Sequence, residues 1–214
     1  MTQPDLFTEE RRRVEFDLGA VLLGGFALDE ISALMEGIEA VEAAAPFRRM
    51  ETPGGWSMSV AMTNCGPAGW TTSRRGYCYT DRDPESGALW PLMPETLAEV
   101  ARRAAAVAGY PGFEPDACLV NRYEPGARLS LHQDRDEADK SAPIVSLSLG
   151  LPAVFLWGGE KRSDRPRRIT LHHGDAVVWG GLSRLNFHGI DALAAGDHAV
   201  TGPLRYNLTF RKAR

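Results

Sequence analysis

The sequence has few cysteines and no long run of apolar residues. Cys65, Cys78 and Cys118 are its only cysteines and form no C-x-x-C pair, which argues against the disulfide framework of a secreted domain and against a zinc ribbon. No stretch approaches the roughly 18 consecutive apolar residues of a membrane span. The basic residues 11–13 are followed by residues 14–17 (VEFD) and not by the apolar core of a signal peptide. We therefore expect a cytoplasmic protein without membrane contact.

Nucleotide-binding glycine motifs are also missing. The chain has no P-loop and no dinucleotide-binding glycine pattern, which argues against chemistry driven by ATP or NAD. Its net charge is −4, so the chain as a whole lacks the positive surface of most nucleic-acid-binding proteins. Arginine is nevertheless concentrated at 48–49, 74–75 and 161–168. Each cluster is either a phosphate contact, since a phosphate senses charge only within roughly 8–10 Å, or a solvated surface.

What is present is the composition of one globular domain. The 214 residues are 43% hydrophobic and 24% charged, which is ordinary for a globular protein. A chain of this length buries roughly 70% of its unfolded surface, so its core needs no disulfide or metal. We expect a single domain over residues 1–214, acting as a monomer.

Apolar residues spaced three and four apart predict two amphipathic helices, at 28–43 and 94–108. Pro94 suits the first position of the second helix, and Gly109 ends it. Residues 1–45 are accordingly expected to be an N-terminal helical region. The segment 46–90 is rich in Gly, Pro, Thr and aromatics, which favours short strands and loops of a binding surface.

From residue 116 onward the pattern is that of β-structure. Turn residues separate seven short segments that each predict a strand: 117–123, 128–133, 144–149, 153–157, 168–172, 175–179 and 204–211. Many short strands without intervening helices are typical of a sandwich or jelly roll. We predict a mainly β fold with flanking helices (α+β), in which residues 116–214 form the jelly-roll core.

The tripeptide His132-Gln133-Asp134 indicates a metal site. Alternate side chains share one face of a strand, so His132 and Asp134 can point together. His188, in the sequence NFHG, follows the later strands and can complete the two-histidine, one-carboxylate triad of non-haem iron(II) oxygenases. This triad leaves three metal positions open for other ligands. An H-x-D tripeptide alone is weak evidence, and three further histidines are rival ligands: His172, His173 and His198.

The strand RYNLTFR near the C-terminus carries two arginines on one face. At a period of two, Arg205, Asn207, Thr209 and Arg211 alternate with three apolar residues that suit the core. The arginines are either solvated or bind a dicarboxylate, because a guanidinium pairs with carboxylates through two hydrogen bonds and keeps its charge.

Together, H-x-D, a histidine 56 residues after the first and R-x-N-x-x-x-R resemble the AlkB family of Fe(II)- and 2-oxoglutarate-dependent dioxygenases. The similarity runs with little or no gap from about Pro46 to Arg211, whereas the first 45 residues match loosely. The matching segments are TPGGWSMSVAMTNCG, GYPGFEPDACLVNRYEPGARLSLHQDRDE, APIVSLSLGLPA, HGDAVVWGG and RYNLTFR. The fold this implies is a double-stranded β-helix, which is a jelly roll, with a nucleotide-recognition lid at 46–90.

The resemblance implies the ligands of iron and cosubstrate. The positions that match the iron ligands are His132, Asp134 and His188. Those that match the 2-oxoglutarate site are Asn121, Tyr123, Arg205, Asn207 and Arg211, with Arg205 on the distal carboxylate and Arg211 near the keto-acid end. Fe(II) would thus be the cofactor, with 2-oxoglutarate and O₂ as cosubstrates.

The resemblance also implies a base pocket. Trp70 matches the aromatic that stacks on a flipped base, with His132 on the other face, and Asp136 matches a residue near the exocyclic amino group. Further matching positions line the pocket or the strand backbone, namely Met62, Tyr77, Arg128 and Arg162, while Thr52 and Trp56 fall in the lid. The family pattern has tyrosine where this chain has Trp56 and lysine where it has Arg128, and both departures concern substrate contacts, not the chemistry.

The implied activity is the oxidative removal of methyl groups from bases such as N1-methyladenine and N3-methylcytosine in DNA, with RNA as a second candidate substrate, and with release of formaldehyde and succinate. Methylation at these positions makes the base cationic, and an indole face attracts a cation by roughly 0.5–2 kcal/mol. Three alternatives stay open. They are a 2-oxoglutarate oxygenase acting on tRNA, free nucleotides or protein, a non-enzymatic reader of alkylated bases, and a cupin-like sugar- or metal-binding protein.

Overall fold

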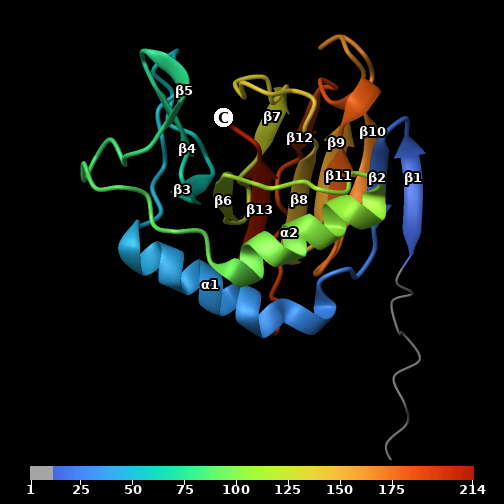
Figure 1. Cartoon of the computed structure of the whole chain (residues 1–214), viewed down its shortest axis with the longest axis horizontal. Coiled ribbons are helices and arrows are strands. Elements are labelled where there is room, and N and C mark those ends of the chain that lie inside the picture. The colour runs from blue at the N-terminus through green and yellow to red at the C-terminus, as the bar shows by residue number, and fades with distance from the viewer. Residues whose placement is uncertain (1–11) are drawn as a thin grey trace, which may run out of the picture.

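The computed structural model describes residues 12–214, and the first eleven residues of the expected N-terminal region lie outside this range. A seven-stranded sheet in the order β1-β2-β11-β8-β13-β6-β3 faces a four-stranded sheet in the order β10-β9-β12-β7 (Figure 1). Strands β4 and β5 form a separate hairpin. The expected mainly β fold with flanking helices, a jelly roll, is confirmed.

The elements have the following bounds. The strands are β1 Arg13–Asp17, β2 Ala20–Leu23, β3 Ala61–Cys65, β4 Gly69–Ser73, β5 Gly76–Thr80, β6 Ala117–Tyr123, β7 Leu129–His132, β8 Ile144–Gly150, β9 Ala153–Trp157, β10 Arg167–Leu171, β11 Ala176–Trp179, β12 His188–Ile190 and β13 Arg205–Arg211. The helices are α1 Ile31–Ala44 and α2 Glu95–Ala108, and two short 3₁₀ turns lie at Leu28–Glu30 and Gly181–Ser183.

Two hydrophobic clusters fill the spaces between the helices, the large sheet and the small sheet. The first joins α1 and α2 to one face of the large sheet, where it includes Tyr206, Leu208 and Phe210 of β13. The second fills the space between the two sheets and includes Phe155 and Trp179. Because side chains alternate along a strand, the polar residues of β13 face away from the helices, toward the space between the sheets.

The N-terminal region differs from the expected helical one. Before α1, β1 and β2 form an antiparallel pair, and β2 also pairs with β11, so that this hairpin extends the large sheet. Val21 and Leu23 enter one hydrophobic cluster while Ala20 and Leu22 enter the other. A strand buried on both faces is apolar throughout and lacks the alternation that identifies a half-buried strand, which is why the sequence did not predict it.

Candidate active site

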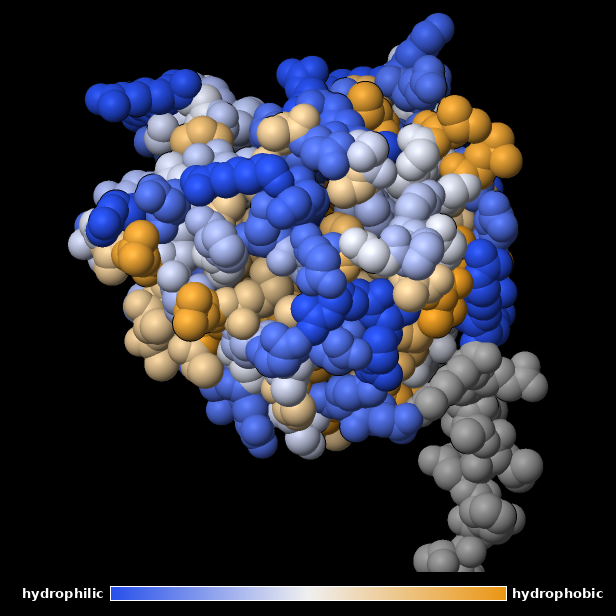
Figure 2. Space-filling view, in the orientation of Figure 1, coloured by the Kyte–Doolittle hydropathy of each residue, from blue (hydrophilic) through white to orange (hydrophobic). Residues whose placement is uncertain are grey.

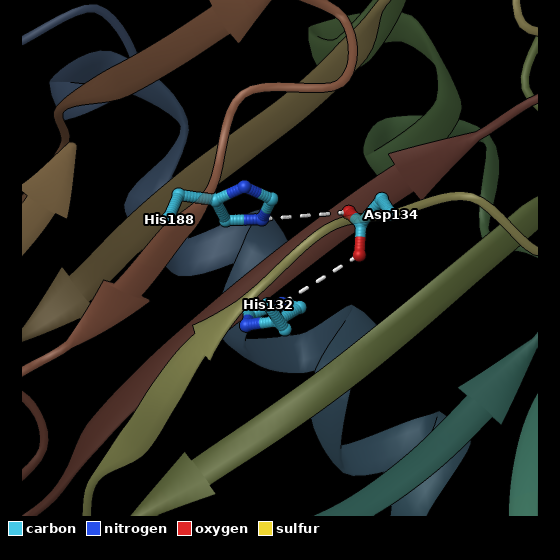
Figure 3. A group of neighbouring side chains, drawn as sticks. All are labelled: His132, Asp134 and His188. Atoms are coloured by element: carbon cyan, nitrogen blue, oxygen red, sulfur yellow. Dashed lines mark ion pairs between the residues drawn. The ribbon is translucent and has the colours of Figure 1, made fainter. Parts of the chain in front are cut away.

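The metal group is built where two neighbouring strands meet. His132 ends β7 and His188 begins β12, and the two residues lie directly opposite each other in this antiparallel pair. Asp134 follows two residues after β7, and its carboxylate points toward both imidazoles (Figure 3). Its Oδ1 lies 3.6 Å from Nε2 of His132, and its Oδ2 lies 3.7 Å from Nε2 of His188.

Both imidazoles are oriented by backbone carbonyls. Nδ1 of His132 lies 2.9 Å from the carbonyl oxygen of Ser130, and Nδ1 of His188 lies 3.0 Å from that of Asn186. Such a contact fits an Nδ1–H donor and leaves the lone pair of each Nε2 for a metal. Burial and the neighbouring His132 lower the pKa of His188 to about 4, so its imidazole is neutral near pH 7.

One ligand atom from each of the three residues lies within 4.8 Å of the other two, and within residues 12–214 this is the only such group of three or more His, Cys, Asp or Glu side chains. Two imidazole nitrogens and one carboxylate oxygen fit Fe(II). The rival histidines are elsewhere: His173 and His198 pack together with ring centroids 4.3 Å apart, and Nδ1 of His173 accepts a hydrogen bond from the Gly150 amide.

The carboxylate of Asp134 is also paired with an arginine. Nη2 and Nε of Arg211 donate to Oδ2 of Asp134 at 2.9 and 3.1 Å. Burial by itself would raise the pKa of Asp134, but the positive charge of Arg211 and the neighbouring His188 hold it well below its usual range. The carboxylate is therefore charged near pH 7.

A polar strip on β13 continues from Arg211 into the molecule. Asn207 donates to the Ser146 hydroxyl at 2.8 Å, and Thr209 donates to Oδ1 of Asn207 at 3.0 Å. Asn121 of β6 lies across from Asn207, and its Nδ2 donates to Oδ1 of Asn207 at 3.2 Å.

Arg205 ends this strip with unused donors. It is fully buried, its Nη2 donates to the Ser148 hydroxyl at 3.0 Å, and its Nε and Nη1 have no hydrogen-bond partner. Its guanidinium lies 4.9 Å from the centroid of the Tyr123 ring. Since buried donors are costly to leave unsatisfied, these nitrogens fit a ligand carboxylate such as the distal one of 2-oxoglutarate.

A cavity of about 800 Å³ contains the metal group and connects it to the hairpin β4–β5. Every residue predicted above for metal, cosubstrate, base or lid lines this cavity except Arg205, which packs against the ring of the cavity residue Tyr123. In the hairpin, the Trp70 and Tyr77 rings are stacked with centroids 5.5 Å apart, and Nε1 of Trp70 donates to Oδ2 of Asp136 at 3.0 Å. The site thus joins a metal-binding end to an aromatic end.

The predicted lid residues lie at the open side of the cavity. Trp56 is 78% exposed, and its amide donates to the Thr52 hydroxyl at 3.1 Å. An ion pair of 2.8 Å between Arg74 and Glu51 ties this turn to the hairpin β4–β5. Arg128 and Arg162 are exposed at the same opening, where the Arg162 guanidinium lies 5.4 Å from the Phe187 ring centroid.

The chain matches the family model of the 2OG-Fe(II) oxygenase superfamily over residues 19–211. It is 59% identical to the alpha-ketoglutarate-dependent dioxygenase AlkB of Salmonella typhimurium and 56% identical to that of Escherichia coli, in each case covering 98% of this chain and 97% of the relative. The chain belongs to the AlkB family. The solved structure of OsALKBH1 superimposes with a TM-score of 0.81 at 29% identity, covering 94% of this chain and all of that one.

This AlkB-family chain is accordingly an Fe(II)- and 2-oxoglutarate-dependent dioxygenase that uses O₂. The donor set of the metal group and the open donors of Arg205 fit this cofactor and cosubstrate. In the part of the chain that the structure describes, no helix is both long and apolar enough to cross a membrane.

The sequence did not single out several residues that the structure places in or beside the site. Trp179 lines the cavity with its ring centroid 4.8 Å from that of His188. Ser146 and Ser148 alternate with apolar residues in IVSLSLG, and this period of two was a usable signal that they face Asn207 and Arg205. Glu137 and Arg184 are buried beside Arg211, and no local pattern identifies them.

Proposed function

We propose that this enzyme demethylates alkylated bases such as N1-methyladenine and N3-methylcytosine in nucleic acid. The observation that carries the proposal is that the indole of Trp70, held by Asp136, borders the same cavity as the metal group. A methylated base that is cationic suits an aromatic face beside a carboxylate. More distant relatives are named DNA N(6)-methyladenine demethylase in Arabidopsis thaliana and tRNA demethylase in Schizosaccharomyces pombe.

In this proposal His132, Asp134 and His188 hold the iron. Iron held there would combine O₂ with 2-oxoglutarate, so that one oxygen atom enters succinate, carbon dioxide is released, and the other oxygen atom hydroxylates the N-methyl carbon, which then leaves as formaldehyde. The protein orients the reactants and excludes water. The cosubstrate is held by residues of two neighbouring strands: Asn121, Tyr123, Arg205, Asn207 and Arg211.

On the base side, Trp70 stacks on the base, with Tyr77 on the other indole face and His132 on the far side of the base. Asp136 accepts a hydrogen bond from the exocyclic amino group as well as from Trp70. Met62 lines the buried part of the base pocket, and Arg128, Arg162, Thr52 and Trp56, around the opening, contact the base or its backbone. Segment 46–90 is the nucleotide-recognition lid, residues 116–214 form the catalytic core, and the whole chain is one domain.

We further propose single-stranded DNA as the preferred substrate, with RNA as a second. A base must leave its stack to reach a buried metal, and an unpaired base does so at lower cost. We also propose that the enzyme acts as a monomer in the cytoplasm. All of the proposed site residues come from one chain, and on the face seen in Figure 2 hydrophobic residues gather in small groups amid a largely hydrophilic surface.

The test is a single-turnover assay. The protein is mixed anaerobically with Fe(II), 2-oxoglutarate and an oligonucleotide that contains one N1-methyladenine or N3-methylcytosine. O₂ is then admitted, and the mass of the oligonucleotide is measured by mass spectrometry. We expect loss of the methyl group with one succinate and one formaldehyde formed per event, fastest on the single strand. Consumption of 2-oxoglutarate without demethylation of any of these oligonucleotides, but with modification of tRNA, free nucleotides or protein, would refute the proposed substrate.

A further inference from the structure

A second group of charged side chains lies beside the metal group. Glu137 and Arg184 are each 3% exposed, and neither lines the cavity. Oε2 of Glu137 accepts a hydrogen bond from Nη2 of Arg184 at 3.0 Å, and Oε1 accepts one from the Tyr79 hydroxyl at 2.7 Å. None of the roles proposed above uses these three residues.

This group reaches the metal site through Arg211. Nε of Arg211 lies 3.1 Å from Oδ2 of Asp134 and 3.4 Å from Oε1 of Glu137, so its guanidinium stands between two carboxylates. The Arg184 side chain binds the backbone of the segment 134–142. Its Nη1 donates to the Asp134 carbonyl at 2.5 Å, and its Nε donates to the Ala142 carbonyl at 3.0 Å. The position of Asp134 therefore depends on both arginines.

The arrangement balances two buried carboxylates with two buried guanidinium groups. Charges interact much more strongly in the protein interior than in water, so Arg211 facing Asp134 alone would compete with a cation for its carboxylate. Glu137 also attracts Arg211, which weakens the pull of Arg211 on Asp134, and its negative charge compensates the positive charge of Arg184. It adds a negative charge close to the metal group without itself offering a ligand atom to that group.

Tyr79 connects this network to the lid. It belongs to β5, in the hairpin that carries Trp70 and Tyr77. Burial raises the pKa of Tyr79 above its usual value, with Glu137 and Asp134 adding to the rise against the opposing charge of Arg211. The hydroxyl therefore keeps its proton and serves as a donor to Glu137.

We propose that Glu137 is a positioning residue of the metal centre, which shares Arg211 with Asp134 and so keeps the Asp134 carboxylate available to a divalent cation, and that Tyr79 fixes Glu137 in this place. The inference rests on the proposed metal site at His132, Asp134 and His188. The hydrogen bond from Tyr79 to Glu137 thereby connects the hairpin β4–β5 of the lid to the residue that positions the Asp134 carboxylate.

The test measures Mn(II) binding, in place of Fe(II), to the full chain by electron paramagnetic resonance of the free ion. Glu137→Gln keeps the shape of the side chain and removes its charge, and we expect the dissociation constant of Mn(II) to rise about tenfold. Asp83→Asn is the matched control, since Asp83 is likewise buried and its Oδ1 lies 2.6 Å from Nη2 of Arg48. Neither residue of this ion pair lines the cavity. We expect Asp83→Asn to lower the melting temperature as Glu137→Gln does but to leave Mn(II) affinity within twofold of wild type.

A second pair of variants covers the case in which Glu137→Gln does not fold. Tyr79→Phe removes only the hydroxyl, and we expect Mn(II) affinity to fall about threefold. Its control is Tyr110→Phe, which removes a hydroxyl that donates to the Gly19 carbonyl at 2.8 Å and should leave Mn(II) affinity unchanged.

Mn(II) affinity within twofold of wild type in both Glu137→Gln and Tyr79→Phe would overturn the inference, as would an equal loss in either control. Asp134→Asn separates this outcome from a failure of the proposed metal site. If wild type binds Mn(II) no better than Asp134→Asn does, the metal site itself is wrong. If Asp134→Asn loses binding while Glu137→Gln keeps it, only the role of Glu137 is wrong.

Discussion

Asp134 has two partners at the scale of single residues, and its loss affects both. Replacing it by Asn removes the only carboxylate of the metal group and leaves Arg211 with Glu137 as its remaining anionic partner. We predict that Asp134→Asn abolishes demethylation. Removing one partner of a buried ion pair typically costs about 3–5 kcal/mol of stability, so the melting temperature should also fall. Thermal unfolding and the single-turnover assay check both effects, and near wild-type turnover with iron present would contradict the ligand assignment.

Arg205 is the clearest site for a ligand carboxylate, because two of its buried nitrogens have no partner. We predict that Arg205→Ala weakens 2-oxoglutarate binding at least about thirtyfold, since losing one partner of a buried charge pair costs about 2–5 kcal/mol. Arg205→Lys keeps the charge but not the two-pronged geometry and should fall in between. Calorimetric titration with 2-oxoglutarate in the presence of Mn(II) measures this, and a loss below about threefold would remove Arg205 from the cosubstrate site.

Much of the site could be predicted at this scale because its residues follow local patterns. H-x-D on a strand and the period of two in RYNLTFR bring ligand groups to one face wherever the strand lies. Glu137 and Arg184 could not be predicted in the same way, since they are 47 residues apart in sequence and meet only in the folded chain. Charged residues alone in a sequence usually indicate a solvated surface.

At the scale of elements, the helices and most strands after residue 116 were predictable, whereas β1, β2 and β12 were not. The predicted segments 117–123 and 153–157 coincide with β6 and β9, and the predicted helix 94–108 differs from α2 by one residue. Strand β12 has three residues, which is too short to show a period, although it carries His188. Pairing with β7 and β9 defines this strand, and such pairing is a property of the fold.

The hairpin β4–β5 carries the prediction that belongs to this scale. We expect Trp70→Ala to weaken binding of a methylated oligonucleotide by about ten- to a hundredfold, because stacking of a base on an aromatic contributes roughly 1–3 kcal/mol. The affinity for 2-oxoglutarate should stay within about twofold, since Trp70 forms its hydrogen bonds with Asn64 and Asp136, and neither belongs to that site. Both affinities and the melting temperature are measured on the one variant.

The opposite reading of Trp70 is a packing role, because the ring also lies against the cluster between the sheets. Deleting a buried tryptophan costs about 3–5 kcal/mol. A variant with a much lower melting temperature and proportionate loss of both ligands would therefore assign Trp70 to the core.

At the scale of the whole molecule, the negative net charge opposes long-range attraction of a nucleic acid, which is also negatively charged. The chain carries a net charge of −4, while the exposed Arg128 and Arg162 lie at the opening of the cavity. Affinity for a phosphate backbone must then come from a few local contacts and not from the overall field, because exposed charges are screened beyond roughly 8–10 Å.

The dependence of binding on salt tests this arrangement. Each phosphate contact to a single strand contributes about −0.7 to the slope of log K against log salt concentration. We predict that Arg128→Gln and Arg162→Gln each make the slope for a methylated single-stranded oligonucleotide shallower by about that amount. The control is Arg103→Gln on α2, since the helices cover the opposite face of the large sheet from the cavity, and its slope should equal that of wild type. Unchanged slopes in both cavity variants, or an equal change in the control, would show that these arginines belong to a solvated surface and that the nucleic acid is held by the base pocket alone.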